Sequence, residues 1–179
     1  AGKAENQTAT TSGQASGELT GMKIAYVEID TLLAQYNFCI DLNEGMVKKS
    51  ENVRLTLNQK ARELDKQKQD FQTKYQNNAY LSPERAQQEY NRIAKLEQDL
   101  QTLSNKLQSE LMSENEKNSL QLRDSINAFL KEYNKTKGYS MIISNTGFDN
   151  LLYADSIYNI TKEIVEGLNA RYSSPAPKK

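Results

Sequence analysis

The sequence predicts an α+β protein in which a small β-containing body carries one long helical hairpin arm. Residues 41–137 consist largely of Gln, Glu, Lys, Arg, Leu and Asn, with one proline and one glycine. This composition favours helix, because unbranched side chains lose little rotamer freedom there. The β-prone segments lie only outside this stretch, near both ends of the chain. Apolar residues make up 37% of the 179 residues, and so low a share fits an extended shape better than a sphere.

The centre of the helical stretch is the segment Ser82-Pro83-Glu84. Ser82 can accept hydrogen bonds from free amide groups, Pro83 fits the first helical position, and Glu84 suits the positive end of a helix. The proline also disfavours a helical conformation at the residue before it. One helix is therefore expected to end near Asn78 and the next to begin near Pro83. Together they predict an antiparallel hairpin over residues 41–137.

Both arm helices carry apolar residues at spacings of three, four or seven. The outgoing helix has Val53, Leu57, Ala61, Leu64, Phe71 and Tyr75, and the returning helix has Ala86, Tyr90, Ile93, Leu96, Leu100, Leu103, Leu107 and Leu111. Two such stripes joined by a short turn should pack as an antiparallel coiled coil. The returning helix is the longer one, about 80 Å against about 57 Å. Its last turns, around 126–133, are therefore expected to enter the body.

The N-terminal part of the body is predicted to be a strand followed by a short helix. Residues 23–29 are β-prone and predict a largely buried strand. Asp30 or Thr31 is expected to cap the short helix. Asp41 with Glu44 resembles a capping box, so the first arm helix should begin there.

The C-terminal part of the body is predicted to contain two strands and a helix. Gly138 follows a last turn rich in lysine and is a strong stop for the returning arm helix. Residues 139–144 and 151–154 predict two strands, separated by a turn that contains Gly147. Asn159 is expected to cap a final amphipathic helix.

The predicted domain organisation is a body of residues 22–40 and 138–172 at the base of the arm. Three short strands and two short helices make a small core that is hard to stabilise alone, and strand edges remain to be covered. Both problems are relieved if several chains join their sheets. We therefore expect an oligomer whose arms project from a shared body.

The two ends of the chain are predicted to lie outside the folded part. Residues 1–21 are rich in Ala, Thr, Ser, Gly, Gln and Glu and should be disordered. They are either a processing remnant or a tether between a membrane anchor and the folded part, which leaves membrane contact open. Residues 173–179 are expected to form a frayed tail.

The composition argues against catalysis and against nucleic-acid binding. Lys+Arg and Asp+Glu both total 23, so no overall field attracts nucleic acid. The chain has no His and no glycine-rich phosphate loop, and its single cysteine, Cys39, has apolar neighbours typical of a buried structural thiol. Paired carboxylates such as Glu114 and Glu116 lie on predicted exposed helix faces, although carboxylates alone leave a metal site open. We expect neither an enzyme nor a cofactor, and we predict no metal ligands.

Five residues near the hairpin tip are candidate contacts for a partner protein: Phe71, Tyr75, Tyr80, Leu81 and Tyr90. A solvated coiled coil needs few aromatic residues, so their clustering stands out. For Phe71 and Tyr75, packing of the tip is an equally good interpretation. Tyr80 and Leu81 lie in or beside the turn and are better candidates for contact with a partner. Residues 60–95 also hold eight basic and five acidic residues. This excess could help to retain acidic or partly unfolded chains, but a solvated face explains it more simply.

Four stretches carry a resemblance to a known family: MKIAYVEIDTLLAQY at 22–36, GYSMIISN at 138–145, LLYAD at 151–155 and ITKEIV at 160–165. With the hairpin between them, they resemble the Skp (OmpH) family of periplasmic chaperones over residues 22–172. The arm sequence itself is generic coiled coil and contributes only its length and its turn.

The resemblance implies a homotrimer in which the strands build a shared β body and three arms enclose a cavity. It also implies a holdase that keeps unfolded outer-membrane β-barrel proteins from aggregating in the periplasm, without ATP. The body and trimer residues would be Ile24, Tyr26, Val27, Ile142, Ile143, Leu151 and Leu152, and the arm residues around 71–90 would reach the client. Family members are often strongly basic, so the neutral charge of this chain weakens any expectation of electrostatic client capture or lipopolysaccharide binding.

The alternative is a structural or adaptor coiled coil that binds one folded partner through its hairpin tip. Binding would then depend on Tyr80 and Leu81. A holdase would instead spread many weak contacts over its arms.

Overall fold

The computed structural model describes residues 21–147 and 151–173. The elements in chain order are β1 (Ile24–Glu28), α1 (Ile29–Gln35), α2 (Asn37–Gln76), α3 (Pro83–Lys137), β2 (Met141–Asn145), a 3-10 helix η1 (Ser156–Tyr158) and α4 (Thr161–Arg171). Long helices combined with a small two-stranded sheet confirm the predicted α+β class. The predictions of a disordered leader at 1–21, whether remnant or tether, and of a frayed tail at 173–179 concern residues that lie almost wholly outside the described ones.

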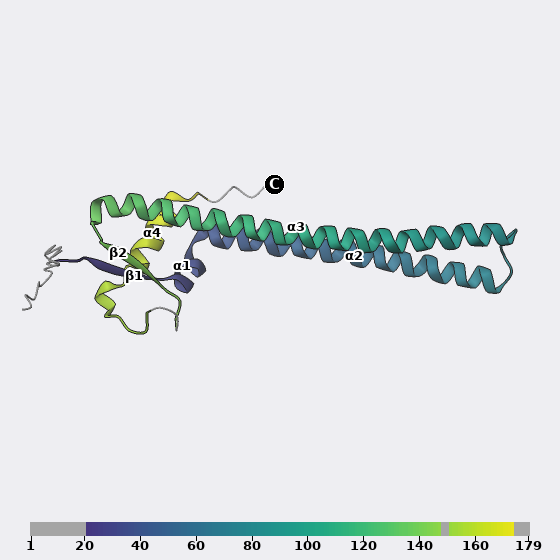
Figure 1. Cartoon of the computed structure of the whole chain (residues 1–179), viewed down its shortest axis with the longest axis horizontal. Helices are drawn as coiled ribbons and strands as arrows, with labels where there is room; N and C mark the ends of the chain where they lie inside the picture. The colour runs from purple at the N-terminus through teal and green to yellow at the C-terminus, as the bar shows by residue number, and fades with distance from the viewer. Residues whose placement is uncertain (1–20, 148–150, 174–179) are drawn as a thin grey trace, which may run out of the picture.

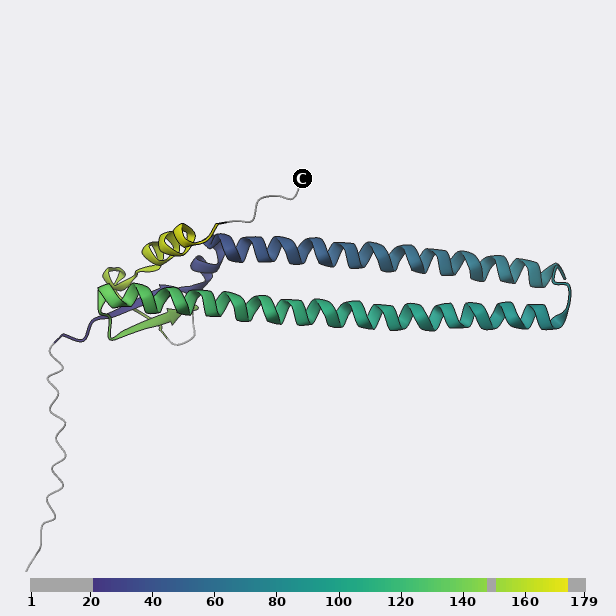
Figure 2. The same ribbon diagram turned by 90° about the horizontal axis from the view of Figure 1, so that it is seen from above.

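The chain forms a small body at one end, from which α2 and α3 extend side by side (Figure 1). The turn after α2 reverses the chain, so α3 returns along α2 to the body (Figure 2). Ser82 has extended backbone and its Oγ accepts a hydrogen bond from the Arg85 N–H at 3.3 Å, with Pro83 at the first helical position. At the other end of α3, Gly138 has a φ of 69°, a left-handed conformation that glycine adopts without strain. Both predicted ends of the returning helix are thus confirmed.

The contact between α2 and α3 is a seam of apolar side chains. Leu64, Ala86 and Ile93 are buried in it, and the other members of the two stripes are mostly half-buried. Two ion pairs link the helices across the seam, Lys68–Glu97 at 2.8 Å and Lys49–Glu114 at 3.3 Å. Exposed pairs of this kind contribute about 0–1 kcal/mol each. The apolar seam is therefore the main source of stability in the arm.

The sheet of the body pairs β1 and β2 in parallel, with Ile24 opposite Met141 and Glu28 opposite Asn145. The other side of β1 is met by the segment before α4, where the Ile160 N–H donates to the Tyr26 carbonyl at 3.1 Å. The predicted third strand at 151–154 is wrong, because these residues form no strand. The segment has strand-forming side chains, but a strand needs a hydrogen-bonding partner, and it meets none among the described residues.

The core of the body lies between β1, α1, α4 and the last turns of α3. Tyr36, Leu32, Ile164 and Leu168 are its largest fully buried side chains. The apolar group at the end of α3, which comprises Leu122, Ile126, Phe129, Leu130 and Tyr133, packs against this core. The longer returning helix therefore enters the body, as its length predicts.

The junction of α1 and α2 differs from the prediction. The expected capping box of Asp41 and Glu44 is wrong, because α2 begins at Asn37 and only Tyr36 interrupts the helices. The Asn169 side chain from α4 holds this break: its Oδ1 accepts from the Asn37 N–H at 2.8 Å, and its Nδ2 donates to the Gln35 carbonyl at 2.9 Å.

Asp41 has a different partner, because it accepts a hydrogen bond from Tyr172 Oη at 2.9 Å. That hydrogen bond, together with burial, raises the pKa of Tyr172 to about 12, with burial the larger cause. This hydrogen bond links the segment after α4 to the first turns of α2.

The start of α1 also differs from the prediction, because the helix begins at Ile29 and places Asp30 and Thr31 inside its first turn. The buried Thr161 hydroxyl instead accepts from the Glu28 N–H at 2.8 Å. The predicted cap at Asn159 is wrong by one residue, because Ile160 is the N-cap of α4 and makes no side-chain cap hydrogen bond. Asn159 precedes it, and its Oδ1 accepts from the Thr161 N–H at 3.0 Å.

Gly167 and Gly45 should respond in opposite ways to replacement by alanine. A Cβ at Gly167 would overlap the Phe129 ring, which is itself stacked on Tyr133. We expect Gly167→Ala to lower the free energy of unfolding by about 1–3 kcal/mol. A Cβ at Gly45 meets nothing within 4 Å, so Gly45→Ala in α2 should raise the free energy of unfolding by about 0.5–1 kcal/mol. Urea unfolding of the two variants measures both changes. Equal effects of the two substitutions would contradict the packing of α4 on α3.

Loss of the Asn169 side chain should destabilise the α1–α2 junction. Asn169→Ala leaves one backbone amide and one backbone carbonyl without their shared partner. We expect the free energy of unfolding, measured with urea, to fall by about 1 kcal/mol. Hydrogen exchange should accelerate at residues 37–40. Asn52→Ala, on an exposed face of α2, is the matched control and should change stability by less than about 0.5 kcal/mol. Equal effects of the two changes would show that Asn169 does not hold the junction.

Candidate client-contact surface at the arm tip

The aromatic residues at the tip gather around Phe71. Its ring centroid lies 5.6 Å from that of Tyr80, 5.9 Å from Tyr75 and 6.2 Å from Tyr90. Phe71 and Tyr75 come from α2, Tyr80 from the turn and Tyr90 from α3. The structure thus brings four of the five candidate residues into one cluster, and Phe71 serves to pack it. The sequence pattern did not identify Phe71 as the centre, because the cluster depends on where the turn places Tyr80.

The same cluster still offers apolar surface to solvent. Tyr75 is 62% exposed and Tyr90 is 57% exposed, whereas Phe71 and Tyr80 are half-buried. Leu81 lies outside the ring contacts and is 96% exposed. A leucine held in this way at the far end of an arm has no packing role within the chain, so it is available for contact with another molecule.

Two hollows lie side by side at the tip and share Tyr80 and Leu81. The first, which we call the cationic hollow, is lined by Lys74, Ala79, Tyr80, Leu81, Arg85, Gln88, Glu89 and Arg92. The second, the uncharged hollow, is lined by Tyr75, Asn78, Tyr80, Leu81, Ser82, Pro83 and Ala86. Tyr80 and Leu81 therefore form a ridge between two surfaces of different chemistry.

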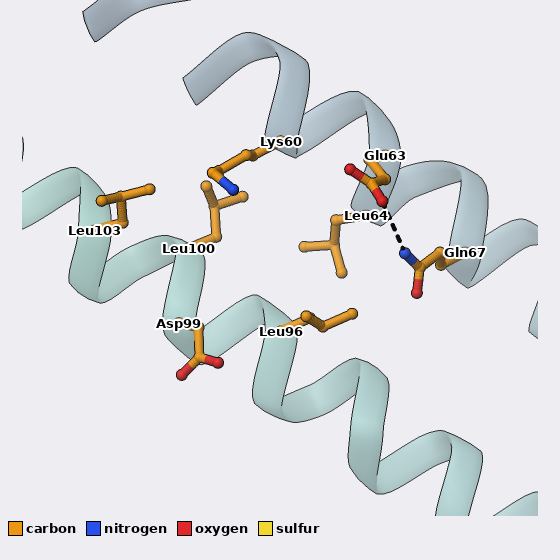
Figure 3. A pocket seen from close by; sticks show the side chains of 8 residues that line it. All are labelled: Lys60, Glu63, Leu64, Gln67, Leu96, Asp99, Leu100 and Leu103. Atoms are coloured by element: carbon orange, nitrogen blue, oxygen red, sulfur yellow. Dashed lines mark hydrogen bonds between the residues drawn. The ribbon is translucent and has the colours of Figure 1, made fainter. Parts of the chain in front are cut away.

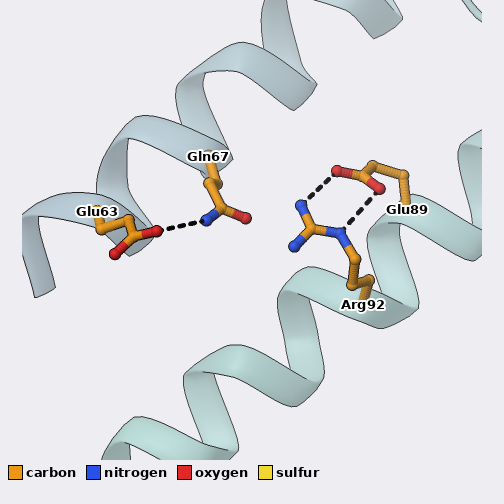
Figure 4. A network of polar contacts seen from close by, with 4 residues as sticks. All are labelled: Glu63, Gln67, Glu89 and Arg92. Carbon is orange, nitrogen blue, oxygen red and sulfur yellow. Dashed lines mark hydrogen bonds and ion pairs between the residues drawn. The ribbon is translucent and has the colours of Figure 1, made fainter. Parts of the chain in front are cut away.

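One ion pair organises the charge at the tip. Arg92 binds Glu89 through two hydrogen bonds, from Nε at 3.0 Å and from Nη2 at 2.6 Å (Figure 4). This contact lowers the pKa of the Glu89 carboxyl, and the charge of Lys74 adds to the effect. Burial, with a smaller effect of Glu89, raises the pKa of the Tyr80 phenol. At neutral pH the pair is therefore ionised on both sides and Tyr80 is a neutral hydroxyl.

A third hollow, of about 230 Å³, lies midway along the arm between α2 and α3 (Figure 3). Leu64 and Leu96 approach it from the two helices, and Lys60, Glu63 and Asp99 lie at its rim. Gln67 donates a long hydrogen bond of 3.5 Å to Glu63, while its own buried Oε1 lacks a hydrogen-bond partner in the described part of the chain. The stripe of apolar residues predicts the leucines here but not the gap between them.

The predicted body and trimer residues divide into two groups. Tyr26 and Val27 are buried within one chain, whereas Ile24, Ile142, Ile143 and Leu151 are half-buried. Leu152 is 82% exposed.

Its neighbours Tyr153, Ile157 and Tyr158 are also exposed, and sequence reasoning missed them. The apolar segment at 151–154 could have indicated this exposed group. An apolar segment that pairs with no strand of its own chain must present its side chains to solvent or to another chain.

The described residues include no group of three or more His, Cys, Asp or Glu side chains placed to hold a metal ion. Cys39 is buried as predicted, and burial raises the pKa of its thiol. Within the described ranges, no helix is both long and apolar enough to cross a membrane.

Comparisons with known proteins place the chain in a family. A family model described as "Outer membrane protein (OmpH-like)" matches residues 23–168. The crystal structure of an OmpH-like protein from Caulobacter crescentus CB15, assigned as an outer membrane chaperone, has a TM-score of 0.75 to this chain at 12% sequence identity. The similarity covers 86% of this chain and 87% of that one, and at so low an identity it shows a shared fold. No curated protein matches the sequence. Because the family match runs from β1 to the last turns of α4, the chain belongs to the OmpH-like family.

Proposed function

We propose that this protein is a periplasmic holdase that binds unfolded outer-membrane β-barrel proteins without ATP and prevents their aggregation. The observation that carries the proposal is the exposed apolar tip of a long arm, with Leu81 at its end. The family description "Outer membrane protein (OmpH-like)" and the chaperone title of the similar Caulobacter structure support the choice of client class. The tip hollows are open surfaces rather than a closed binding pocket, which suits clients of variable sequence.

The rest of the arm supports the same proposal. Apolar side chains are exposed at intervals along both helices, at Val47, Leu55, Met112 and Leu120. Single contacts of this kind are weak, but several of them on one arm raise the effective concentration of the next site. An unfolded chain can then be retained without a fixed binding geometry.

We also propose that three chains join through their bodies. The exposed apolar group Leu152, Tyr153, Ile157 and Tyr158 lies on the body, away from the arm tip. Burying such a group between chains would stabilise a body whose own sheet has two strands. Three arms around a common centre would place several tips near one client.

The trimer proposal predicts the mass of the protein in solution. Light scattering on a sizing column should give about three times the chain mass of 20.3 kDa. Leu152→Lys combined with Ile157→Lys should shift the protein toward monomer, because two charges would be buried in the contact. Tyr75→Lys at the tip is the control and should leave the mass unchanged. A wild-type monomer would overturn the trimer and favour the adaptor alternative.

The holdase proposal predicts that the protein protects a client from aggregation. An equimolar amount of trimer should slow the aggregation of a urea-unfolded outer-membrane β-barrel protein after dilution, as followed by turbidity. Tyr80→Ser with Leu81→Ser should weaken protection by no more than about threefold, because contacts are spread over the arms. Val47→Ser with Leu55→Ser should have an effect of similar size. If protection is absent at every ratio, the holdase proposal fails; if the tip variant abolishes binding to one folded partner, the adaptor alternative is correct.

A further inference from the structure

The cationic hollow at the arm tip has a local charge excess that the neutral total of the chain conceals. Three basic residues and one acidic residue line it, and Glu89 is already paired with Arg92. Lys74 and Arg85 form no ion pair with any carboxylate in the described part of the chain, and both are exposed. Glu84, in the first turn of α3, lines neither hollow. Two cations at the tip therefore remain available to a ligand.

The uncharged hollow next to it has no ionisable lining residue other than the tyrosines. Its surface consists of two aromatic rings, Leu81, Pro83, Ala86 and two small polar side chains. Such a surface accommodates a large apolar or aromatic side chain and offers no partner to a charged one.

Tyr80, which borders both hollows, is packed against another ring. Tyr80 packs on Phe71 at 5.6 Å between ring centroids, and Phe71 is held in turn by Tyr75 and Tyr90. Both hollows are therefore built partly on this packed group of rings.

We propose that the arm tip binds client segments in which an acidic residue lies close to an aromatic or other large apolar residue. The carboxylate would lie between Lys74 and Arg85, and the apolar side chain would lie in the uncharged hollow against Tyr75. The two hollows share Tyr80 and Leu81, so neighbouring side chains of one extended segment would occupy them. This inference rests on the proposed function and gives it a sequence preference, whereas the contacts along the arm helices remain unselective.

Fluorescein-labelled decapeptides test the preference directly. One peptide carries Asp and Phe two positions apart, the second has Asn in place of Asp, and the third has Ser in place of Phe. With the full-length protein, anisotropy should show about tenfold tighter binding of the first peptide than of either other. Raising the salt to 0.5 M should largely remove the difference between the first and second peptides, because exposed charges are screened.

The variants assign the effect to the tip. Lys74→Gln with Arg85→Gln should reduce the affinity for the first peptide to that for the second. Lys66→Gln with Lys117→Gln removes the same charge from exposed arm positions elsewhere and should leave the preference intact. Circular dichroism checks that both double variants are folded. Equal affinities for the three peptides, or equal losses in the two double variants, would overturn the inference.

The aggregation assay separates this inference from the proposed function. If the wild type protects the client but shows no peptide preference, the inference fails and the holdase proposal stands. If the preference is present but protection is absent, the tip recognises acidic apolar segments in a protein that is not a holdase. The expected result is a preference together with protection, in which the tip double variant keeps most of the protection and loses the preference.

Discussion

The parallel pairing of β1 with β2 is the constraint on which the rest of the structure depends. Two parallel neighbouring strands need a connection that returns the chain to the end at which the first strand began. Here α1, α2 and α3 together make that connection. α3 has 55 residues against 40 in α2, and its extra turns amount to about 22 Å of helix. They carry the chain past the root of α2 and along the body, so that the Ser140 N–H reaches the Lys23 carbonyl at 2.7 Å.

The C-terminal segment fastens this connection to the strand that precedes it. Thr161 binds the end of β1, Asn169 bridges α1 and α2, and Tyr172 binds Asp41 near the start of α2. Gly167 allows α4 to approach the Phe129 ring on α3. The helix α4 thus contacts β1, α1, α2 and α3, and the body remains one unit although most of the chain separates its two halves.

The parts of the fold that local signals determine could be predicted from the sequence, and the parts that distant contacts determine could not. Ser82 with Pro83 and the stop at Gly138 act within one turn of the chain, and the apolar spacing of the arm needs no other element. The start of α2 escaped prediction because its partner, Asn169, lies 132 residues away. The run at 151–154 has the side chains of a strand without a strand to pair with. The candidate tip residues were found by composition, but the two hollows arise from two helices and a turn and have no linear signature.

Both helices of the arm join the same body, so the length of the arm can change without changing the contacts within the body. The seam between α2 and α3 repeats along its length, so removing seven residues from each helix would keep the apolar stripes facing each other. Neither the pairing of β1 with β2 nor the contacts of α4 would change, since they lie at the root. The arm therefore behaves as a spacer of adjustable length, whose reach can change by matched insertions and deletions while the body stays the same.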